Sequence, residues 1–187
     1  VFAAPRDVVE GSTASITVEN AVKDDVLAAY KLINITYNST TNTLAYEWSS
    51  PAIKDYFENG TTNGTGIVYD VKKFAELSDN TETNQTALKD LLAGLPKYIV
   101  DNTIVAVKTE TVDADGNATF ADLAMGEYFI RPTSTTSVYQ LMLQKVEPTV
   151  SGSKYVIDDV TFTAKHKEVT GNKTADKTSV TKNEKVT

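Results

Sequence analysis

The spacing of the apolar residues constrains the fold of this chain most strongly, because it changes twice along the sequence. Near the start, residues 12–19, 26–37 and 44–48 either alternate apolar with polar side chains or are rich in β-branched and aromatic residues. Both patterns are typical of β-strands. The polar stretch 38–42 separates the second and third runs, which predicts an antiparallel pair joined by a turn.

The middle of the chain changes to helical spacing. Ser49 or Ser50 can cap a first helix that has Pro51 in its first turn. A second helix is predicted to begin at the cap Asp70, and a third to run from Thr83 until Pro96. Between the first two, residues 59–66 are rich in glycine and asparagine and predict a flexible loop.

The chain then returns to strands. Further strands are predicted at residues 103–110, 118–120, 126–131, 138–146 and 155–165. A strand pair, a helical insertion and a run of strands together predict an all-β fold. We expect an antiparallel immunoglobulin-like β-sandwich with short helices inserted between strands.

Composition excludes several classes of partner. The 187 residues carry a formal net charge of −7, whereas nucleic-acid binding and anionic membrane surfaces favour clustered basic residues. The chain has no cysteine, which excludes disulfides and cysteine-ligated zinc. No apolar run approaches the roughly 20 residues of a membrane-spanning helix, so we expect no membrane insertion of this domain.

Three segments are expected along the chain. Residues 1–11 resemble the small-residue end of a secretory signal peptide followed by a short N-terminal segment, with a frayed terminus as the alternative. Residues 12–169 form the predicted domain. Residues 170–187 contain lysines among small polar residues and are interpreted as a linker or the first strand of a following domain, with a disordered tail as the alternative.

No set of residues predicts catalysis, a cofactor or a metal site. Asp113, Asp115 and Asn117 match the start of a calcium loop, but the glycine and glutamate that such a loop needs are absent, and a turn around Gly116 explains the same residues. The only histidine, His166, lies at the end of a predicted strand and has no nucleophile motif to serve. We therefore expect a non-enzymatic protein; a hydrolase has the least support.

The last predicted strand carries the most informative pattern. In residues 160–165, strict alternation directs Val160, Phe162 and Ala164 inward and leaves Thr161, Thr163 and Lys165 on the solvent face. Taken alone, Lys165 would be one more solvated lysine.

These segments resemble the N-terminal domain of the backbone pilins that Gram-positive bacteria assemble with sortases, a Cna-B-type sandwich. The resemblance lies in Ala28-Ala-Tyr-Lys-Leu32, in the Gly126-Glu-Tyr128 segment, and in the final strand. That strand is similar to the family's V-x-V-Y-P-K pilin motif, with Thr163 and Ala164 in place of the tyrosine and proline.

The resemblance implies a structural role at the cell surface. Lys165 would be the amine that a class C sortase joins to the C-terminal threonine of a neighbouring subunit, and Lys167 is the second candidate. Expected partners are other pilin subunits and the sortase, in a secreted, cell-wall-attached pilus. The alternative is a surface adhesin domain that binds a host protein or glycan, because one fold can serve both roles.

The resemblance also bears on internal cross-links. Many Cna-B-type domains join a lysine to an asparagine with the help of an acidic residue in a motif called the E-box. Residues 12–19 contain no lysine, Arg131 occupies the E-box position, and Glu127 is in the wrong register to replace it. We therefore expect no internal isopeptide bond.

Overall fold

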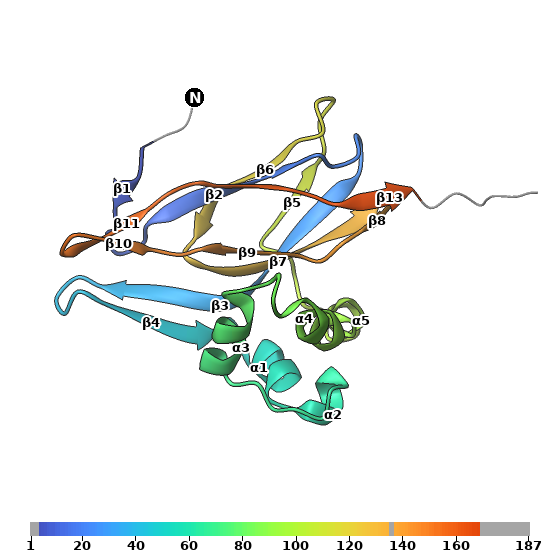
Figure 1. The fold of residues 1–187 in the computed structure, drawn as a ribbon, viewed down its shortest axis with the longest axis horizontal. Helices are drawn as coiled ribbons and strands as arrows, with labels where there is room; N and C mark the ends of the chain where they lie inside the picture. The colour runs from blue at the N-terminus through green and yellow to red at the C-terminus, as the bar shows by residue number, and fades with distance from the viewer. Residues whose placement is uncertain (1–3, 135–136, 169–187) are drawn as a thin grey trace, which may run out of the picture.

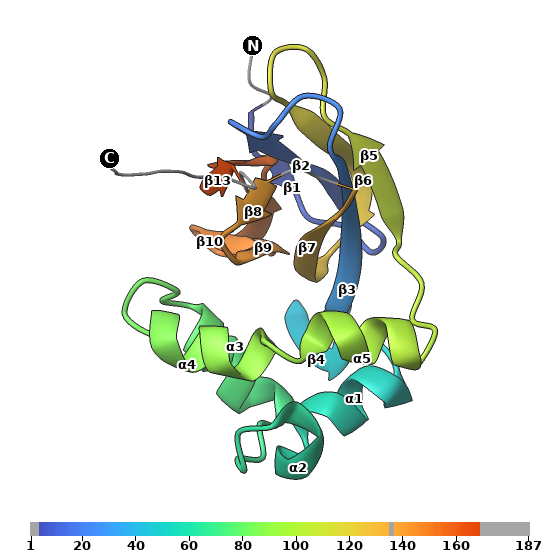
Figure 2. The same cartoon turned by 90° about the vertical axis from the view of Figure 1, so that its right-hand side faces the viewer.

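The computed structural model describes residues 4–134 and 137–168. Two β-sheets face each other and a helical layer covers one side of the larger sheet (Figures 1 and 2). The larger sheet has the order β4 (Thr43–Trp48), β3 (Val26–Asn38), β7 (Gly126–Ser134) and β9 (Met142–Val146), and β5 (Lys108–Thr111) also pairs with β3. The second sheet has the order β12 (Val160–Thr163), β2 (Thr13–Glu19) and β6 (Ala118–Ala124).

Two small sheets extend the sandwich at its ends. One joins β1 (Arg6–Asp7), β11 (Lys154–Ile157) and β10 (Thr149–Ser151). The other joins β13 (His166–Glu168) to β8 (Ser137–Tyr139). The strands β1 and β13 lie at opposite ends of the long axis (Figure 1).

The predicted fold class is confirmed, with one parallel pair among the antiparallel ones. Strand β12 runs parallel to β2, from Val160 opposite Ile16 to Thr163 opposite Glu19. The inward side chains of β2, Ile16 and Val18, are fully buried, and Phe120 of β6 is buried beside them. This alternation builds the core between the two sheets.

The sequence of strand β3 is apolar almost throughout rather than alternating, because both faces of the strand are covered. Its burial pattern shows buried residues on both faces over most of its 13 residues. One face lies against the second sheet, and the helical layer lies below the other (Figure 2). A strand that is covered on both sides loses the polar positions that a solvated face would require.

The helical layer consists of α1 (Pro51–Phe57), α2 (Gly60–Asn63), α3 (Val71–Ser78), α4 (Gln85–Leu92) and α5 (Leu95–Asp101). The predicted caps are confirmed: the Ser50 side chain accepts from the amide of Ile53, and the Asp70 carboxylate accepts from the amide of Lys73 at 2.7 Å. Aromatic rings fill the space between this layer and β4, with Trp48 stacked on Phe57 at 4.7 Å between centroids.

Several boundaries differ from the predictions. The third predicted helix ends earlier than expected, at Leu92 of α4, and the further helix α5 follows it. Pro96 lies in the first turn of α5, where backbone amides have no partner within the helix, so proline is tolerated there and begins a helix rather than ending one. Residues 59–66 are not a loop throughout, since α2 lies within them, capped by the Asn59 side chain. The predicted strands 138–146 and 155–165 are each broken in two, at Gln140–Leu141 and Asp158–Asp159.

The expected segments 1–11 and 170–187 fall differently on the described part of the chain. Within the first, Arg6 and Asp7 pair with Ile157 and Val156. The second lies outside the described residues. No described helix has the length and apolar character needed to cross a membrane.

Candidate functional site

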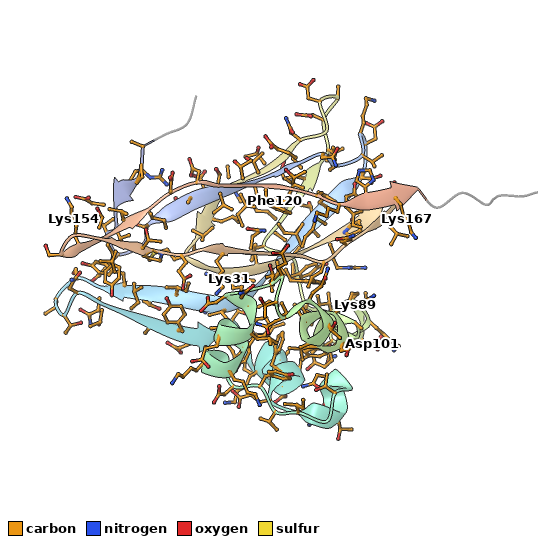
Figure 3. The ribbon with its side chains drawn as sticks, viewed as in Figure 1. Lys31, Lys89, Asp101, Phe120, Lys154 and Lys167 are labelled. Atoms are coloured by element: carbon orange, nitrogen blue, oxygen red, sulfur yellow. The ribbon has the colours of Figure 1, made fainter. Side chains whose placement is uncertain are left out.

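The segment after β12 keeps its alternation although the strand itself ends at Thr163. Ala164 is buried and His166 is half-buried, whereas Thr161, Thr163, Lys165 and Lys167 are exposed. The predicted solvent face is therefore confirmed, and Lys167 shares it with Lys165. Figure 3 shows Lys167 at the end of the molecule opposite Lys154.

Backbone hydrogen bonds hold this segment against three neighbouring elements. The amide of Ala164 donates to the carbonyl oxygen of Glu19 at 2.8 Å, and the amide of Gln140 donates to the carbonyl oxygen of Lys165 at 2.8 Å. Lys167 lies opposite Val138 in the β13–β8 pair. The backbone of Lys165 therefore lies in the two-residue gap between β12, which pairs with β2, and β13, which pairs with β8.

Asn20, just after β2, contacts the residues on both sides of Lys165. Its side-chain amide donates to the carbonyl oxygen of Ala164 at 3.0 Å. Its own carbonyl oxygen accepts from Nε2 of His166 at 2.9 Å, which fixes the proton of the ring on Nε2. Nδ1 of His166 is buried without a hydrogen-bond partner among the described residues. The ring of His166 therefore makes a structural contact with the turn after β2, where its position at a strand end left a structural or a solvent-facing role open.

Tyr139 supports the same region from β8. Its ring lies 5.3 Å from the His166 ring, measured between centroids. Its hydroxyl accepts from the amide of Val22 at 2.9 Å and donates to the carboxylate of the buried Asp25 at 2.7 Å. Burial raises the pKa of Tyr139 to about 12, so the hydroxyl stays protonated and able to donate. The turn after β2 is therefore fixed to both β8 and the lysine segment.

The amines of Lys165 and Lys167 make no hydrogen bond or ion pair within residues 4–134 and 137–168. Asp158 and Asp159, the carboxylates just before β12, lie at the other end of that strand, about 20 Å from Lys165 at the rise of an extended strand. Asp159 is also engaged by the amide of Ser15 at 3.0 Å and by Arg6, and these contacts lower its pKa. Neither carboxylate can take a proton directly from Lys165.

The environment of Lys31 is the opposite of that of Lys165. Burial lowers the pKa of Lys31, which favours its neutral form. Its Nζ lies 5.9 Å from the centroid of the Tyr128 ring, between the sandwich and the helical layer (Figure 3). A large acyl donor would reach this half-buried amine less easily than an exposed one.

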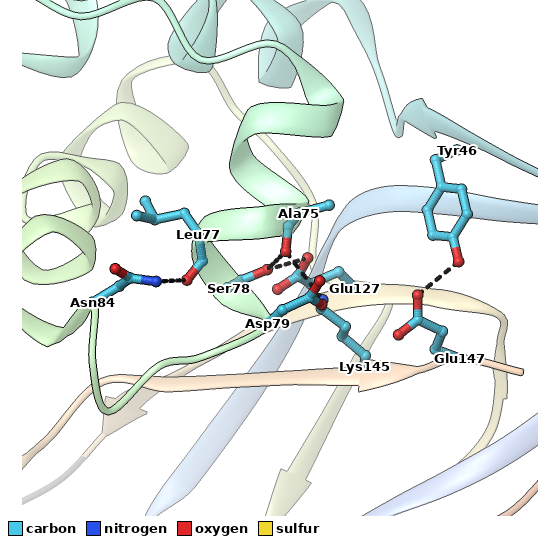
Figure 4. A network of polar contacts seen from close by, with 9 residues as sticks. All are labelled: Tyr46, Ala75, Leu77, Ser78, Asp79, Asn84, Glu127, Lys145 and Glu147. Carbon is cyan, nitrogen blue, oxygen red and sulfur yellow. Dashed lines mark hydrogen bonds and ion pairs between the residues drawn. The ribbon is translucent and has the colours of Figure 1, made fainter. Parts of the chain in front are cut away.

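The position that an E-box acid would occupy, Arg131, lies opposite Ala28 in the β3–β7 pair. Glu127 instead faces the helical layer, where it is 2% exposed. The hydroxyl of Ser78 donates to its Oε1 at 3.1 Å, and Oε2 has no hydrogen-bond partner among the described residues (Figure 4). Burial raises the pKa of Glu127 to about 7, although the nearby ammonium of Lys145 acts in the other direction.

The Asp113–Asn117 segment is a turn, as the sequence predicts. The Asp113 carboxylate accepts from the amides of Asp115 and Asn117, both at 2.9 Å. Gly116 has a φ of 84°, in the left-handed region that glycine adopts without strain. These bonds explain the calcium-like sequence without an ion.

Sequence reasoning missed the roles of Asn20 and Glu127. The sequence does carry a signal for Asn20. An asparagine directly after a predicted strand often adopts a left-handed turn conformation, and the φ of Asn20 is 60°. Nothing local distinguishes Glu127 from the other carboxylates, because its burial depends on the helical layer that packs over β7.

Three comparisons relate the chain to known proteins. Residues 74–166 match the family model described as the SpaA prealbumin-like fold domain, which is about half of the chain. The match begins within α3 and ends in β13, so it includes Lys165. A search of curated proteins finds no match.

The solved structures with similarity to the chain include the T6 backbone pilin of serotype M6 Streptococcus pyogenes, with 13% identity and a TM-score of 0.45. The major pilin SpaD from Corynebacterium diphtheriae has 12% identity and a TM-score of 0.41. The alignments cover 86% and 87% of this chain but only 29% and 32% of those pilins, so the chain spans about a third of their length.

The family match and the sandwich agree in the region they share. Strands β6, β7, β9 and β12 all lie within the matched residues, whereas β2 and β3 precede them and complete the two sheets. The chain therefore carries a prealbumin-like domain of the SpaA family.

Proposed function

We propose that this protein is a structural subunit of a covalently polymerised pilus on the surface of a Gram-positive cell, and that a class C sortase uses Lys165 as the acyl acceptor. The observation that carries the proposal is the environment of Lys165. Its amine is exposed and free of ion pairs within the described residues, while the residues on both sides of it are held by hydrogen bonds.

The chemistry is an acyl transfer. The sortase holds the C-terminal threonine of another subunit as a thioester, and the neutral amine of Lys165 attacks the carbonyl carbon. The C–S bond breaks, an amide forms, the sortase thiolate leaves, and the amine loses a proton to a base. Because Asp158 and Asp159 are remote, we expect the sortase to supply that base.

The position of the lysine suits a linear polymer. The lysine segment adjoins β13 at one end of the long axis, and β1 lies at the other (Figure 1). An acceptor amine at this tip leaves space for a second subunit beyond the end of the domain. The same assignment gives the domain other pilin subunits as partners and a secreted, cell-wall-attached location.

The test is polymerisation of the full-length protein with its class C sortase. Lys165→Ala should abolish the ladder of covalent oligomers without changing the folded state, measured by circular dichroism. Lys165→Arg should also abolish it, because a guanidinium stays protonated and is not a nucleophile. Ladders that persist in both variants and disappear in Lys167→Ala would move the acceptor to Lys167.

The alternative proposal, a surface adhesin domain for a host protein or glycan, draws on a different part of the molecule. An open groove of about 930 Å³ lies between β4, α1 and α3 and is lined by Tyr46, Trp48 and several carboxylates. Binding to immobilised host matrix proteins or glycans that is lost in Tyr46→Ala but kept in Lys165→Ala would support this role.

A further inference from the structure

Exposure and charge do not distinguish Lys165 from Lys167. The two residues lie on the same face of one extended segment, both are exposed, and neither amine has an ion pair within the part of the chain that the structure describes. A sortase that approaches this face would meet two amines about 7 Å apart along the backbone. If the sortase uses one of these amines in preference to the other, the difference must come from how the backbone around each lysine is held.

One residue provides that difference. Asn20 binds the carbonyl oxygen of Ala164 through its side chain and the ring of His166 through its own carbonyl oxygen, at 3.0 and 2.9 Å. These two contacts lie directly before and directly after Lys165. Lys167 is held differently, by the backbone pairing of β13 with the three-residue strand β8.

The conformation of Asn20 makes both contacts possible. Its φ of 60° is left-handed, a region that asparagine enters more readily than most residues. Tyr139 holds the following turn through Val22 and Asp25 and packs its ring against His166. The support of Lys165 therefore comes from β2, β8 and β13 together.

We propose that Asn20 and His166 form a clamp that positions Lys165 and so makes it the acceptor in preference to Lys167. The inference rests on the proposed function and extends it by naming positioning residues. Transfer to an amine depends on holding the nucleophile in line with the thioester carbon, and small displacements reduce the rate. A backbone fixed on both sides of Lys165 restricts where its amine can lie.

The test measures which lysine is linked. Full-length protein is polymerised with the class C sortase, and the branched tryptic peptides are quantified by mass spectrometry. Asn20→Asp keeps the side-chain size and the left-handed tendency but turns a donor into a carboxylate oxygen facing the Ala164 carbonyl. The ratio of Lys165 to Lys167 linkage should fall about fivefold or more, as expected for one lost hydrogen bond.

A second variant and a matched control complete the design. His166→Phe keeps a ring against Tyr139 but removes the N–H that Asn20 accepts, and it should lower the ratio in the same way. The control is Asn84→Asp, because the Asn84 amide donates to the carbonyl oxygen of Leu77 at 2.9 Å in the helical layer, far from the lysines. Asn84→Asp should leave the ratio of Lys165 to Lys167 linkage unchanged, even if it lowers the melting temperature as much as the two clamp variants do.

Each result separates the clamp from the proposed function. If the parent protein links through neither lysine, the pilin assignment fails and the clamp fails with it. If the parent links through Lys165 and both clamp variants keep its ratio, the acceptor stands and the clamp is overturned. Should Asn20→Asp fail to fold, His166→Phe decides the question alone. Predominant linkage through Lys167 in the parent protein would also overturn the clamp.

Discussion

Lys165 and Glu127 illustrate how environment sets the behaviour of a single charged residue. The Lys165 amine is in solvent and its backbone is held, whereas the Glu127 carboxyl is buried beneath α3 with one oxygen bound to Ser78. The position of Lys165 could be predicted, because alternation along one strand determines its face. The burial of Glu127 could not, because it requires a helix from a distant part of the chain.

The buried Glu127 should make stability depend on pH. Its folded-state pKa of about 7 exceeds the unfolded value of about 4.3, so the folded state holds the proton more strongly. Its contribution to stability is therefore complete below about pH 4 and is lost as the pH rises to about 7. The loss should be on the order of 3 kcal/mol.

Urea unfolding of the parent and of Glu127→Gln at pH 4.5, 6 and 8 measures this loss. The variant should gain stability relative to the parent as the pH rises, since glutamine carries no titrating proton. The exposed Glu82→Gln serves as the control and should follow the parent at each pH. A pH-independent difference between parent and Glu127→Gln would contradict the assignment.

At the scale of elements, the segment 59–66 differs most from its prediction. Its glycines and asparagines predict a loop, yet Asn63 at the end of α2 is buried and its side chain makes four hydrogen bonds. Its amide donates to the carbonyl oxygens of Phe57 and Ile67, and its oxygen accepts from the amide and hydroxyl of Thr65. Gly60 is also required there, because a Cβ would lie 2.4 Å from the backbone of Gly66.

Asn63→Asp should therefore destabilise the protein by at least about 2 kcal/mol, because the buried carbonyl group of Phe57 and the part-buried one of Ile67 would lose their donor and face a carboxylate. The matched control is Asn59→Asp in the same segment. The Asn59 side chain only accepts, from the amides of Thr61 and Thr62, and aspartate can do the same. Chemical denaturation of both variants measures the difference; equal losses would show that Asn63 is not the organising residue.

At the scale of the whole molecule, the sandwich is held by hydrogen bonds and packing between β2 and its neighbours. Strand β2 joins β6 on one side and β12 on the other, and it carries no lysine. The Lys165 segment continues directly from β12. We therefore expect the two sheets of this domain to stay together without an internal covalent tie.

The intact mass of the folded protein should equal the sequence mass of 20.3 kDa. Mass spectrometry under denaturing conditions measures this directly. A deficit of about 17 Da, the ammonia released when lysine joins asparagine, would show that an internal bond forms. Without that bond, the domain should unfold at a lower temperature than cross-linked relatives, because a covalent tie restricts the unfolded chain.

The sequence by itself determined the fold class, the helical insertion, a cap at Ser49 or Ser50, the cap Asp70, and the outward face of Lys165. Each of these follows from local periodicity or from one side chain bonding a nearby amide, and local patterns are sufficient for such features. The tertiary structure alone decided that Pro96 starts a helix, that residues 59–66 are ordered around Asn63, that Glu127 is buried, and that Asn20 contacts both neighbours of Lys165. These features depend on contacts between residues that are distant in sequence or on packing between layers, and no local pattern specifies either.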